Sequence, residues 1–427
     1  MHPTESDHPL IVYLDIKSPY AYLAWQPTRD LATQLGIKVD WRPFVLDIPS
    51  YLGSAKLDGK GKVATANRTE QQWSGVKYAY FDCRRYANLR ELTVRGTVKI
   101  WNTDLTAIGW LWAKRQDDVV LENYIQTLYV PFWKRELDAE DPDVIEEVLV
   151  TAGADVAGFR DYANGDGAEE NRVLQEAAFD AGIFGVPTFI VDGERYFGRE
   201  HLPRIAWQLQ GGGGQTPGRA YEGSGTVPAE PVPEGPLEVC IDFRCPDSLA
   251  AVNDSLALAE ETGRTLRWLP KQRLLPPLPG DPSDTSRAAR HRRFRYECER
   301  NDAIRYAVVP LSDPFPDWNC DLLHLTLLWI NEAHPDAATS YVRRVFNALW
   351  EEGRHFETVD DVVGVLGEIG AEAGGLADYL AAGPERLSDF EQELRQRRVM
   401  GTPCWLLDGE PFAGRQHVPL IRARLTA

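Results

Sequence analysis

The 427-residue sequence has few basic residues, few cysteines and no long apolar run. Its 46 Lys and Arg residues face 64 Asp and Glu residues, which gives a net charge of −18. Nucleic acids and anionic membranes both attract positively charged surfaces, so we expect neither as a partner. No apolar run approaches the roughly 20 residues that span a bilayer. Because the first ten residues, MHPTESDHPL, do not resemble a secretory signal, we expect a cytoplasmic protein.

The six cysteines form no CxxC pair and no zinc-binding spacing, and the eight histidines show no HExxH pattern. We therefore expect no metal site. In a cytoplasm the six thiols should stay reduced. Hydrophobic residues make up 43% of the chain, so its length suits two domains of roughly 200 residues, each with its own core.

One segment is predicted to be a flexible linker. Residues 211–236, GGGGQTPGRAYEGSGTVPAEPVPEGP, are rich in Gly and Pro and have no apolar period. The glycine quartet lacks the Lys-Ser/Thr pair of a phosphate-binding loop. The sequence thus indicates one domain over 9–210 and a second, diverged domain over 237–427.

The two flanks of this linker repeat each other in three blocks. LIVYLDIKSPYAYLA from Leu10 matches LEVCIDFRCPDSLAA from Leu237, and a short Asp-x-x-Arg-Tyr-Ala motif recurs from Asp82 and from Asp302. VPTFIVDGERYFGREHLPRI matches TPCWLLDGEPFAGRQHVPLI without a gap, with nine of the twenty aligned positions identical. Such self-similarity predicts a tandem duplication.

Each half reads as strand, helix, strand, helical insertion, hairpin and closing helix. In the first half the strands are IVYLDI and IKVDWRPFVL, and Pro19 suits the first turn of the intervening helix. The pattern is helical from about 65 to 180, and Asp192-Gly193 predicts a tight hairpin turn. This order predicts an α/β fold of two tandem thioredoxin-like domains, each with an inserted helical subdomain.

Three motifs carry a resemblance to a known family. They are SPYAYLA from Ser18, the Asn67…Tyr78…Asp82-x-x-Arg85 run, and GVPTFIVDG followed by FGREHL. The chain resembles the 2-hydroxychromene-2-carboxylate isomerase and kappa-class glutathione transferase branch of the DsbA-like thioredoxin superfamily. The resemblance covers nearly all of the first half and the two ends of the second.

The resemblance implies a thiol-dependent isomerase or transferase that acts on a small, electrophilic and often aromatic substrate. It implies glutathione as cosubstrate, with another low-molecular-weight thiol as the alternative. Ser18 is the expected catalytic residue, because an N-cap hydroxyl in the field of a helix N-terminus can donate to a thiolate. The alternative is a serine that only caps the helix.

The resemblance also implies the residues that bind the cosubstrate. The backbone of Val186, exposed by a cis Pro187, would pair with the cysteine of glutathione as an added strand. The sequence departs from the family at Arg199, which replaces a small polar residue. The full set implied is Pro19, Tyr20, Asn67, Val186, Pro187, Gly198, Arg199 and Glu200.

A second candidate site lies in the second half, where Cys245 aligns with Ser18 and stands near Thr402 and Pro403 in the repeat. A helix N-terminus favours the thiolate, whereas the Asp247 carboxylate opposes it. The alternatives are a thiol–disulfide oxidoreductase that uses Cys245, and a non-catalytic binding protein with a degenerate second half. Since the family forms homodimers, we expect the two halves to pair as an intrachain pseudo-dimer, with a further homodimer as an alternative.

Two charged motifs have plain structural explanations. Asp82 and Arg85, three residues apart on a helix, are expected to form a supporting ion pair. The basic run SRAARHRRFRYECER around Arg290 is interpreted as a solvated helix face, with a groove for an anionic substrate as the alternative.

Overall fold

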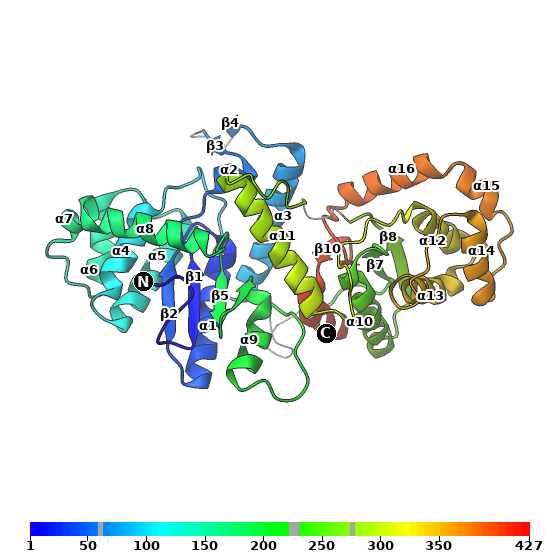
Figure 1. Ribbon diagram of the computed structural model, residues 1–427, viewed down its shortest axis with the longest axis horizontal. Helices are drawn as coiled ribbons and strands as arrows, with labels where there is room; N and C mark the ends of the chain where they lie inside the picture. The colour runs from blue at the N-terminus through cyan, green and yellow to red at the C-terminus, as the bar shows by residue number, and fades with distance from the viewer. Residues whose placement is uncertain (59–62, 222–229, 274–277) are drawn as a thin grey trace. The chain divides into compact units, whose positions relative to one another are not determined.

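The structure is a computed structural model in which each half of the sequence has its own four-stranded sheet (Figure 1). The described residues are 1–58, 63–221, 230–273 and 278–427. The chain divides into two compact units, Met1–Arg219 with Leu278–Arg295, and Ala220–Pro277 with Tyr296–Ala427. Part of the predicted linker, residues 222–229, lies outside the described residues.

The first unit is built on a sheet with the strand order β2-β1-β5-β6. The central strand β1 is parallel to β2 and antiparallel to β5, and β5 is antiparallel to β6. All five residues of β1 are buried, which explains its unbroken apolar sequence. The strands are β1 Leu10–Leu14, β2 Val39–Pro43, β5 Thr188–Val191 and β6 Glu194–Phe197, with a separate hairpin of β3 Ala55–Leu57 and β4 Val63–Ala66.

Helices connect these strands and form the insertion between β2 and β5. Helix α1 links β1 to β2, and a one-turn helix η1 leads from β6 into the closing helix α9. The helices are α1 Pro19–Leu35, α2 Ile48–Leu52, α3 Glu70–Leu89, α4 Asp104–Lys114, α5 Asp118–Lys134, α6 Pro142–Thr151, α7 Phe159–Asn164, α8 Asp166–Asp180, η1 Arg199–His201 and α9 Leu202–Leu209.

The predicted hairpin turn at Asp192-Gly193 is confirmed. Both residues have positive φ, 49° and 78°, and β5 and β6 pair on either side of them. The equivalent Asp408 and Gly409 have φ of 49° and 75°. Two consecutive positive φ angles are the conformation that matches the twist of a two-residue hairpin, and Asp followed by Gly tolerates it.

The second unit repeats this plan with the strand order β10-β9-β7-β8. Its central strand β7 is again parallel to one neighbour, β8, and antiparallel to the other, β9. The strands are β7 Leu237–Ile241, β8 Leu266–Pro270, β9 Cys404–Leu407 and β10 Glu410–Ala413. The helices of this half of the sequence are α10 Pro246–Thr262, α11 Arg287–Arg305, α12 Asp321–Ala333, η2 Pro335–Ala337, α13 Ala338–Trp350, α14 Val359–Glu368, α15 Leu376–Ala381, α16 Gly383–Gln396, η3 Arg415–His417 and α17 Val418–Thr426. The unit boundary falls within α11, after Arg295.

The register of the central strands is the same in both units. Tyr13 is paired with Thr188 across β1 and β5, and Cys240 is paired with Cys404 across β7 and β9. These are the positions that the sequence repeat aligns. The prediction of an α/β fold with two tandem thioredoxin-like domains and helical insertions is therefore confirmed.

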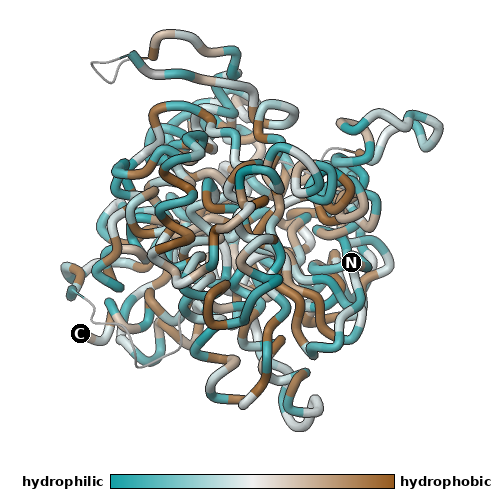
Figure 2. Tube along the Cα trace, turned by 90° about the vertical axis from the view of Figure 1, so that its left-hand side faces the viewer, coloured by the Kyte–Doolittle hydropathy of each residue, from teal (hydrophilic) through white to brown (hydrophobic). Residues whose placement is uncertain are grey.

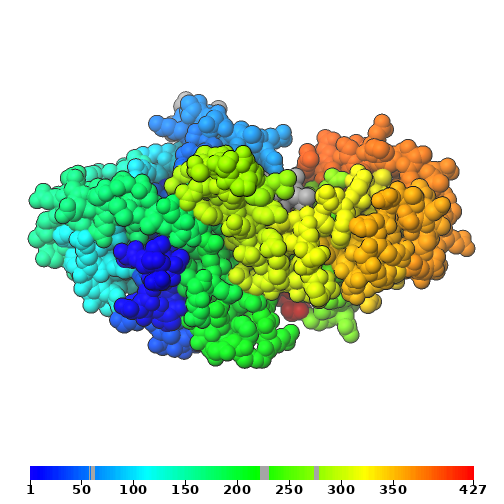
Figure 3. Space-filling model, viewed as in Figure 1, coloured from blue at the N-terminus to red at the C-terminus, as the bar shows by residue number. Residues whose placement is uncertain are grey.

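The prediction that the basic run around Arg290 is a solvated helix face holds for one side of the helix only, where Arg287, Arg292 and Arg295 are exposed. Residues Leu278–Arg295, which precede and begin α11, belong to the first unit although their sequence lies in the second half. Figure 3 shows this yellow-green segment lying against blue and green residues of the first unit. Arg290 forms an ion pair of 2.8 Å with Asp180, so the basic run meets acidic partners there.

Aromatic contacts explain why the other side of this helix is partly shielded from solvent. The His291 ring stacks on Tyr51 with a centroid distance of 4.8 Å and meets the edge of Phe184 at 5.5 Å. Phe294 packs edge-on against Phe179 at 5.5 Å. Burial and nearby arginines lower the pKa of His291 to about 4, so the ring is neutral at physiological pH and stacks without the cost of a buried charge.

Hydrophobic residues recur along the trace in short stretches between hydrophilic ones (Figure 2). Within the described parts of the chain, no helix combines the length and the apolar character needed to cross a membrane.

Candidate active site

The first candidate site is built on the turn between β1 and α1. Ser18 is the N-cap of α1, and its Oγ accepts a hydrogen bond of 3.2 Å from the backbone N–H of Ala21. The same hydroxyl donates to the carbonyl oxygen of Val186 at 3.4 Å. With only 6% of its surface exposed, Ser18 lies at the bottom of this turn, where the partial positive charge of the helix N-terminus is strongest.

The loop before β5 faces this turn. The Val186–Pro187 peptide bond is cis, and the hydroxyl of Thr188 donates to the carbonyl oxygen of Gly185 at 2.7 Å. The carbonyl of Pro187 accepts from the backbone N–H of Gly198 at 3.0 Å. This bond brings the start of η1, with its charged residues, to the loop that contacts Ser18.

Gly198 is required where it stands. Its φ is 114°, in the region that favours glycine, and a Cβ there would collide with the carboxylate of Glu200. The chain can therefore turn sharply from β6 into η1. This turn is what places Arg199 and Glu200 beside the loop.

Tyr20 and Arg199 connect the turn to α3. The Tyr20 hydroxyl donates to Asp82 at 3.4 Å, and Asp82 forms an ion pair of 2.9 Å with Arg85, as the sequence predicted. The Arg199 guanidinium lies over the ring of Tyr86, 4.7 Å from its centroid. Seven of the eight residues implied to bind the cosubstrate are therefore on segments that meet around the Ser18 turn.

Burial raises the pKa of Asp82 to about 6, although Arg85, Arg199 and Tyr20 act in the opposite direction. Only 2% of the Asp82 surface is exposed, so loss of hydration outweighs the two arginines. A carboxyl group with this pKa changes its charge near neutral pH. Because Asp82 accepts a hydrogen bond from Tyr20, this change of charge alters the electrostatic potential at the Ser18 turn, which a permanently charged ion pair would not do.

Asn67 is the predicted residue that the structure does not join to the others. It is exposed at the end of β4, and its side-chain oxygen accepts from the backbone N–H and the hydroxyl of Ser54. None of the hydrogen bonds found among the described residues joins Asn67 to the Ser18 turn.

Two charged residues that none of the sequence motifs singled out, Asp15 and Lys17, shape this turn. The carboxylate of Asp15, 3% exposed, accepts from the backbone N–H of Leu46 at 2.8 Å and lies 3.5 Å from the ammonium of Lys17. The backbone carbonyl of Asp15 also accepts from the N–H of Ser18 at 3.1 Å. The signal was available, because the second half repeats the pattern as Asp242-x-Arg244.

The second candidate site repeats the backbone geometry of the first. Cys245 is the N-cap of α10, and its sulfur lies 3.6 Å from the carbonyl oxygen of Thr402. The Thr402–Pro403 bond is cis, and Pro403 accepts from the backbone N–H of Gly414 at 2.8 Å. The three residues assigned to a second site therefore lie together, although Cys245 is only 1% exposed.

Behind Cys245 lies a buried charged pair that corresponds to Asp15 and Lys17 of the first unit, with a buried histidine beside it. Asp242 pairs with Arg244 at 2.9 Å, and the Nε2 atom of His324 lies 3.6 Å from its carboxylate. Burial lowers the pKa of His324, while the imidazole and Arg244 keep the pKa of the Asp242 carboxyl below its ordinary value. A neutral histidine thus adjoins an ionised carboxylate beneath the cysteine turn.

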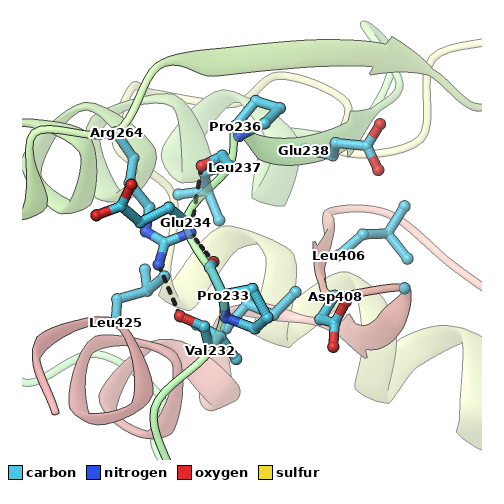
Figure 4. Close-up of a pocket in the computed structure, with 13 residues that line it drawn as sticks. Val232, Pro233, Glu234, Pro236, Leu237, Glu238, Arg264, Leu406, Asp408 and Leu425 are labelled. Atoms are coloured by element: carbon cyan, nitrogen blue, oxygen red, sulfur yellow. Dashed lines mark hydrogen bonds between the residues drawn. The ribbon is translucent and has the colours of Figure 1, made fainter.

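A pocket of about 190 Å³ in the second unit lies elsewhere (Figure 4). Its wall includes Arg264, which donates to the carbonyl oxygens of Val232, Pro233 and Gly235. The pocket adjoins the first residue of β7 and the last residue of β9, whereas Cys245 and Thr402 lie beyond the opposite ends of these strands. At roughly 3.3 Å per residue, a strand length separates the pocket from the cysteine turn.

Comparison with known proteins gives the family. The DsbA-like thioredoxin domain matches residues 9–210 and 237–426. The 2-hydroxychromene-2-carboxylate isomerase of Sphingobium xenophagum is 26% identical over 191 residues, which cover 44% of this chain and 92% of that protein. The protein of the same name from Pseudomonas sp. (strain C18) is 28% identical over 198 residues, which cover 44% of this chain and 84% of that protein.

A solved structure of a 2-hydroxychromene-2-carboxylate isomerase is also similar, with 19% identity and a TM-score of 0.39. The match covers 47% of this chain and 94% of that chain. The two family matches cover both repeats and leave out most of the segment between them. The chain therefore belongs to the DsbA-like thioredoxin domain family and carries two copies of the domain in tandem.

Proposed function

We propose that the first unit catalyses a thiol-dependent isomerisation or transfer on a small, electrophilic organic compound, with glutathione as the thiol. The observation that carries the proposal is the Ser18 hydroxyl, held at the N-terminus of α1 and facing the carbonyl of Val186 at 3.4 Å. Relatives that carry the name of an isomerase support the choice of reaction class.

Ser18 would stabilise the thiolate of the cosubstrate. Its single proton now reaches a neutral carbonyl over a distance that is long for an O–H···O bond. A thiolate is a better acceptor, because hydrogen bonds to charged groups contribute about 1.5–3 kcal/mol against about 0.5–1.5 kcal/mol for neutral ones. The hydroxyl can therefore turn from Val186 to the sulfur, while Oγ still accepts from Ala21.

The backbone of Val186 would hold the cosubstrate's main chain. A carbonyl oxygen has two lone pairs, so the Val186 carbonyl can accept from an incoming amide when Ser18 turns away. A peptide such as glutathione then pairs with this loop as an extra strand. Pro187 would only keep the loop in its present conformation, in which its carbonyl oxygen accepts a hydrogen bond from the backbone N–H of Gly198.

Charges at η1 complement the free amino-acid end of glutathione. Glu200 offers a carboxylate for an ammonium group, and Arg199 offers a guanidinium for a carboxylate. Both are held near Asp82, whose pKa reflects their charges. The two residues therefore orient a zwitterionic end group rather than an apolar one.

The reaction we propose begins with addition of the thiolate to a carbon conjugated with a carbonyl group of the substrate. The electron pair of the carbon–carbon double bond moves to the carbonyl oxygen, and a bond that was double becomes free to rotate. After rotation the electron pair returns and expels the thiolate. If another group leaves instead, the sulfur stays bonded to carbon and the result is a transfer.

The test is an activity assay of the full chain on 2-hydroxychromene-2-carboxylate, with glutathione present and absent. We expect turnover only with glutathione, a lower turnover for Ser18→Ala, and unchanged turnover for Thr33→Ala, which removes an exposed hydroxyl from the same helix. Equal rates with and without any thiol would refute the proposed role of the cosubstrate.

A second candidate function is thiol–disulfide exchange at Cys245, favoured by its sulfur lying 3.6 Å from the Thr402 carbonyl. A mixed disulfide between Cys245 and glutathione, trapped in the full chain and lost in Cys245→Ser, would support it.

A further inference from the structure

Cysteines in the second unit replace hydroxyl-bearing residues of the first. Cys245 stands where the first unit has Ser18, and each caps the helix after the central strand. The central strands add two more replacements. Cys240 occupies the position of Tyr13, and Cys404 occupies the position of Thr188.

Cys240 and Cys404 are direct partners across two neighbouring antiparallel strands. Directly opposed residues point to the same face of a sheet, with Cα atoms about 4.5–5.5 Å apart. A disulfide needs a Cα separation of about 4.4–6.8 Å, so the strand register alone satisfies its main requirement. The other cysteines of the second unit, Cys245, Cys298 and Cys320, lie on helices or at helix caps and are not in this register.

The pair is enclosed in a compact apolar cluster. Both cysteines have 0% of their surface exposed. Burial raises the pKa of the Cys240 thiol, and a negative charge on Cys404 would raise it further. The neighbours are Leu269, Leu394, Val399 and Leu406. In the closed structure such surroundings favour the protonated form of the Cys240 thiol and exclude bulky reagents.

We propose that Cys240 and Cys404 form a redox-active dithiol that a small peroxide converts to a disulfide. When a local opening admits water and peroxide, one thiol loses its proton and the thiolate attacks a peroxide oxygen. The O–O bond breaks, the sulfur keeps one oxygen as a sulfenic acid, and the other oxygen takes up a proton and leaves as water. The second thiol attacks this sulfur, the S–S bond forms and a second water leaves. Two protein thiols are thus oxidised by two electrons, and one hydrogen peroxide is reduced to two waters.

The enclosed position selects the oxidant. Hydrogen peroxide is about as small as water and can enter during a local opening of the strands. A tripeptide disulfide such as oxidised glutathione cannot fit among these leucines. The new bond would fix β7 to β9 directly beside Pro403, and so would hold the Thr402 carbonyl against Cys245. The proposal is independent of the function proposed for the first unit.

The experiment treats the full, folded chain with hydrogen peroxide, blocks remaining thiols by alkylation and maps the digested protein by mass spectrometry. We expect a linked pair of peptides that contain Cys240 and Cys404, removed by dithiothreitol, and faster formation at higher pH because the thiolate reacts. Oxidised glutathione should leave both residues unmodified.

Variants make the test specific. Cys404→Thr installs the residue of the first unit and should abolish the linked peptides, and Cys240→Ala should do the same. Cys320→Ser, the control, should retain them. Circular dichroism and the thermal midpoint establish that each variant is folded. The proposal is overturned if the folded wild-type chain yields no such peptides, links Cys404 to Cys245 instead, or accepts glutathione at Cys240 or Cys404.

Discussion

The hydroxyl of Ser18 donates to the carbonyl oxygen of Val186 over 3.4 Å, joining the first turn of α1 to the loop that precedes β5. In the second unit the sulfur of Cys245 meets the carbonyl oxygen of Thr402 over 3.6 Å. The same backbone geometry thus presents oxygen in one unit and sulfur in the other. The two atoms favour different chemistry. The Ser18 hydroxyl can donate a hydrogen bond to the thiolate of a bound cosubstrate, whereas the Cys245 thiol can itself lose its proton and form a covalent bond with sulfur.

The first prediction concerns Ser18→Ala. Loss of a hydrogen bond to a charged sulfur should cost about 1.5–3 kcal/mol of transition-state stabilisation, which is a fall of roughly 10- to 150-fold in kcat. The KM for glutathione should change less, because the bond matters most when the sulfur is charged. Steady-state kinetics at several glutathione concentrations measure both constants. A variant with the wild-type kcat would show that Ser18 only caps the helix and has no catalytic role.

The second prediction concerns the pH dependence of stability that Asp82 imposes. Its pKa is raised from 3.8 to about 6, chiefly by burial, so the folded protein holds this proton more tightly than the unfolded chain does. The stabilisation is fully present below about pH 4 and is lost as the pH rises through 6. At 1.36 kcal/mol per pKa unit, the loss amounts to about 3 kcal/mol.

Asp82→Asn lacks this titration. The free energy of unfolding of the variant, relative to the wild type, should therefore rise by about 3 kcal/mol between pH 4 and pH 7. Urea unfolding at a series of pH values measures the difference, and the exposed Asp143→Asn serves as the control. A difference that does not vary with pH would mean that Asp82 is not a buried, titrating carboxyl group.

The backbone plan and the Ser18 turn could be predicted because short local patterns specify them. An N-cap serine before proline starts α1, Asp-Gly forms the hairpin, and the repeat applies the same rules twice. The residues beside Ser18 in space were harder to predict. Asp15 and Lys17 are next to it in the chain, but their importance depends on burial, which no local pattern gives.

Contacts between residues far apart in sequence escaped prediction wherever no family motif linked them. His291 has charged residues on both sides in sequence, and its run reads as a solvent-exposed helix face. It is half-buried because Tyr51 and Phe184 offer aromatic surfaces in the first unit. Asn67 is the opposite case, because a family motif placed it at the site and the structure does not. Its side-chain oxygen accepts hydrogen bonds from Ser54 instead, which the motif spacing does not predict.

The third prediction concerns the docking of residues 278–295 on the first unit. Phe294→Ala removes the ring that packs against Phe179 and should cost about 2 kcal/mol, less than the 3–5 kcal/mol of a fully buried phenylalanine, because Phe294 is half-buried. Hydrogen exchange should speed up in this segment and around Tyr51. Arg292→Ala, an exposed position on the same helix, is the control. Unchanged exchange would show that Phe294 does not hold the segment.

The last prediction concerns Cys245→Ser, which gives the second unit the residue that the first already has. If catalysis occurs at Ser18, the variant should keep wild-type kcat and KM. The native thiol should be alkylated far more slowly than that of the urea-unfolded chain, since only 1% of Cys245 is exposed. Iodoacetamide labelling followed by peptide mapping measures the rate at this residue. Fast labelling in the folded protein, together with an inactive serine variant, would show that catalysis occurs at Cys245 in the second unit. Thiol–disulfide exchange would then explain the site better than isomerisation, because a reactive thiol needs no hydroxyl donor to form a covalent bond with sulfur.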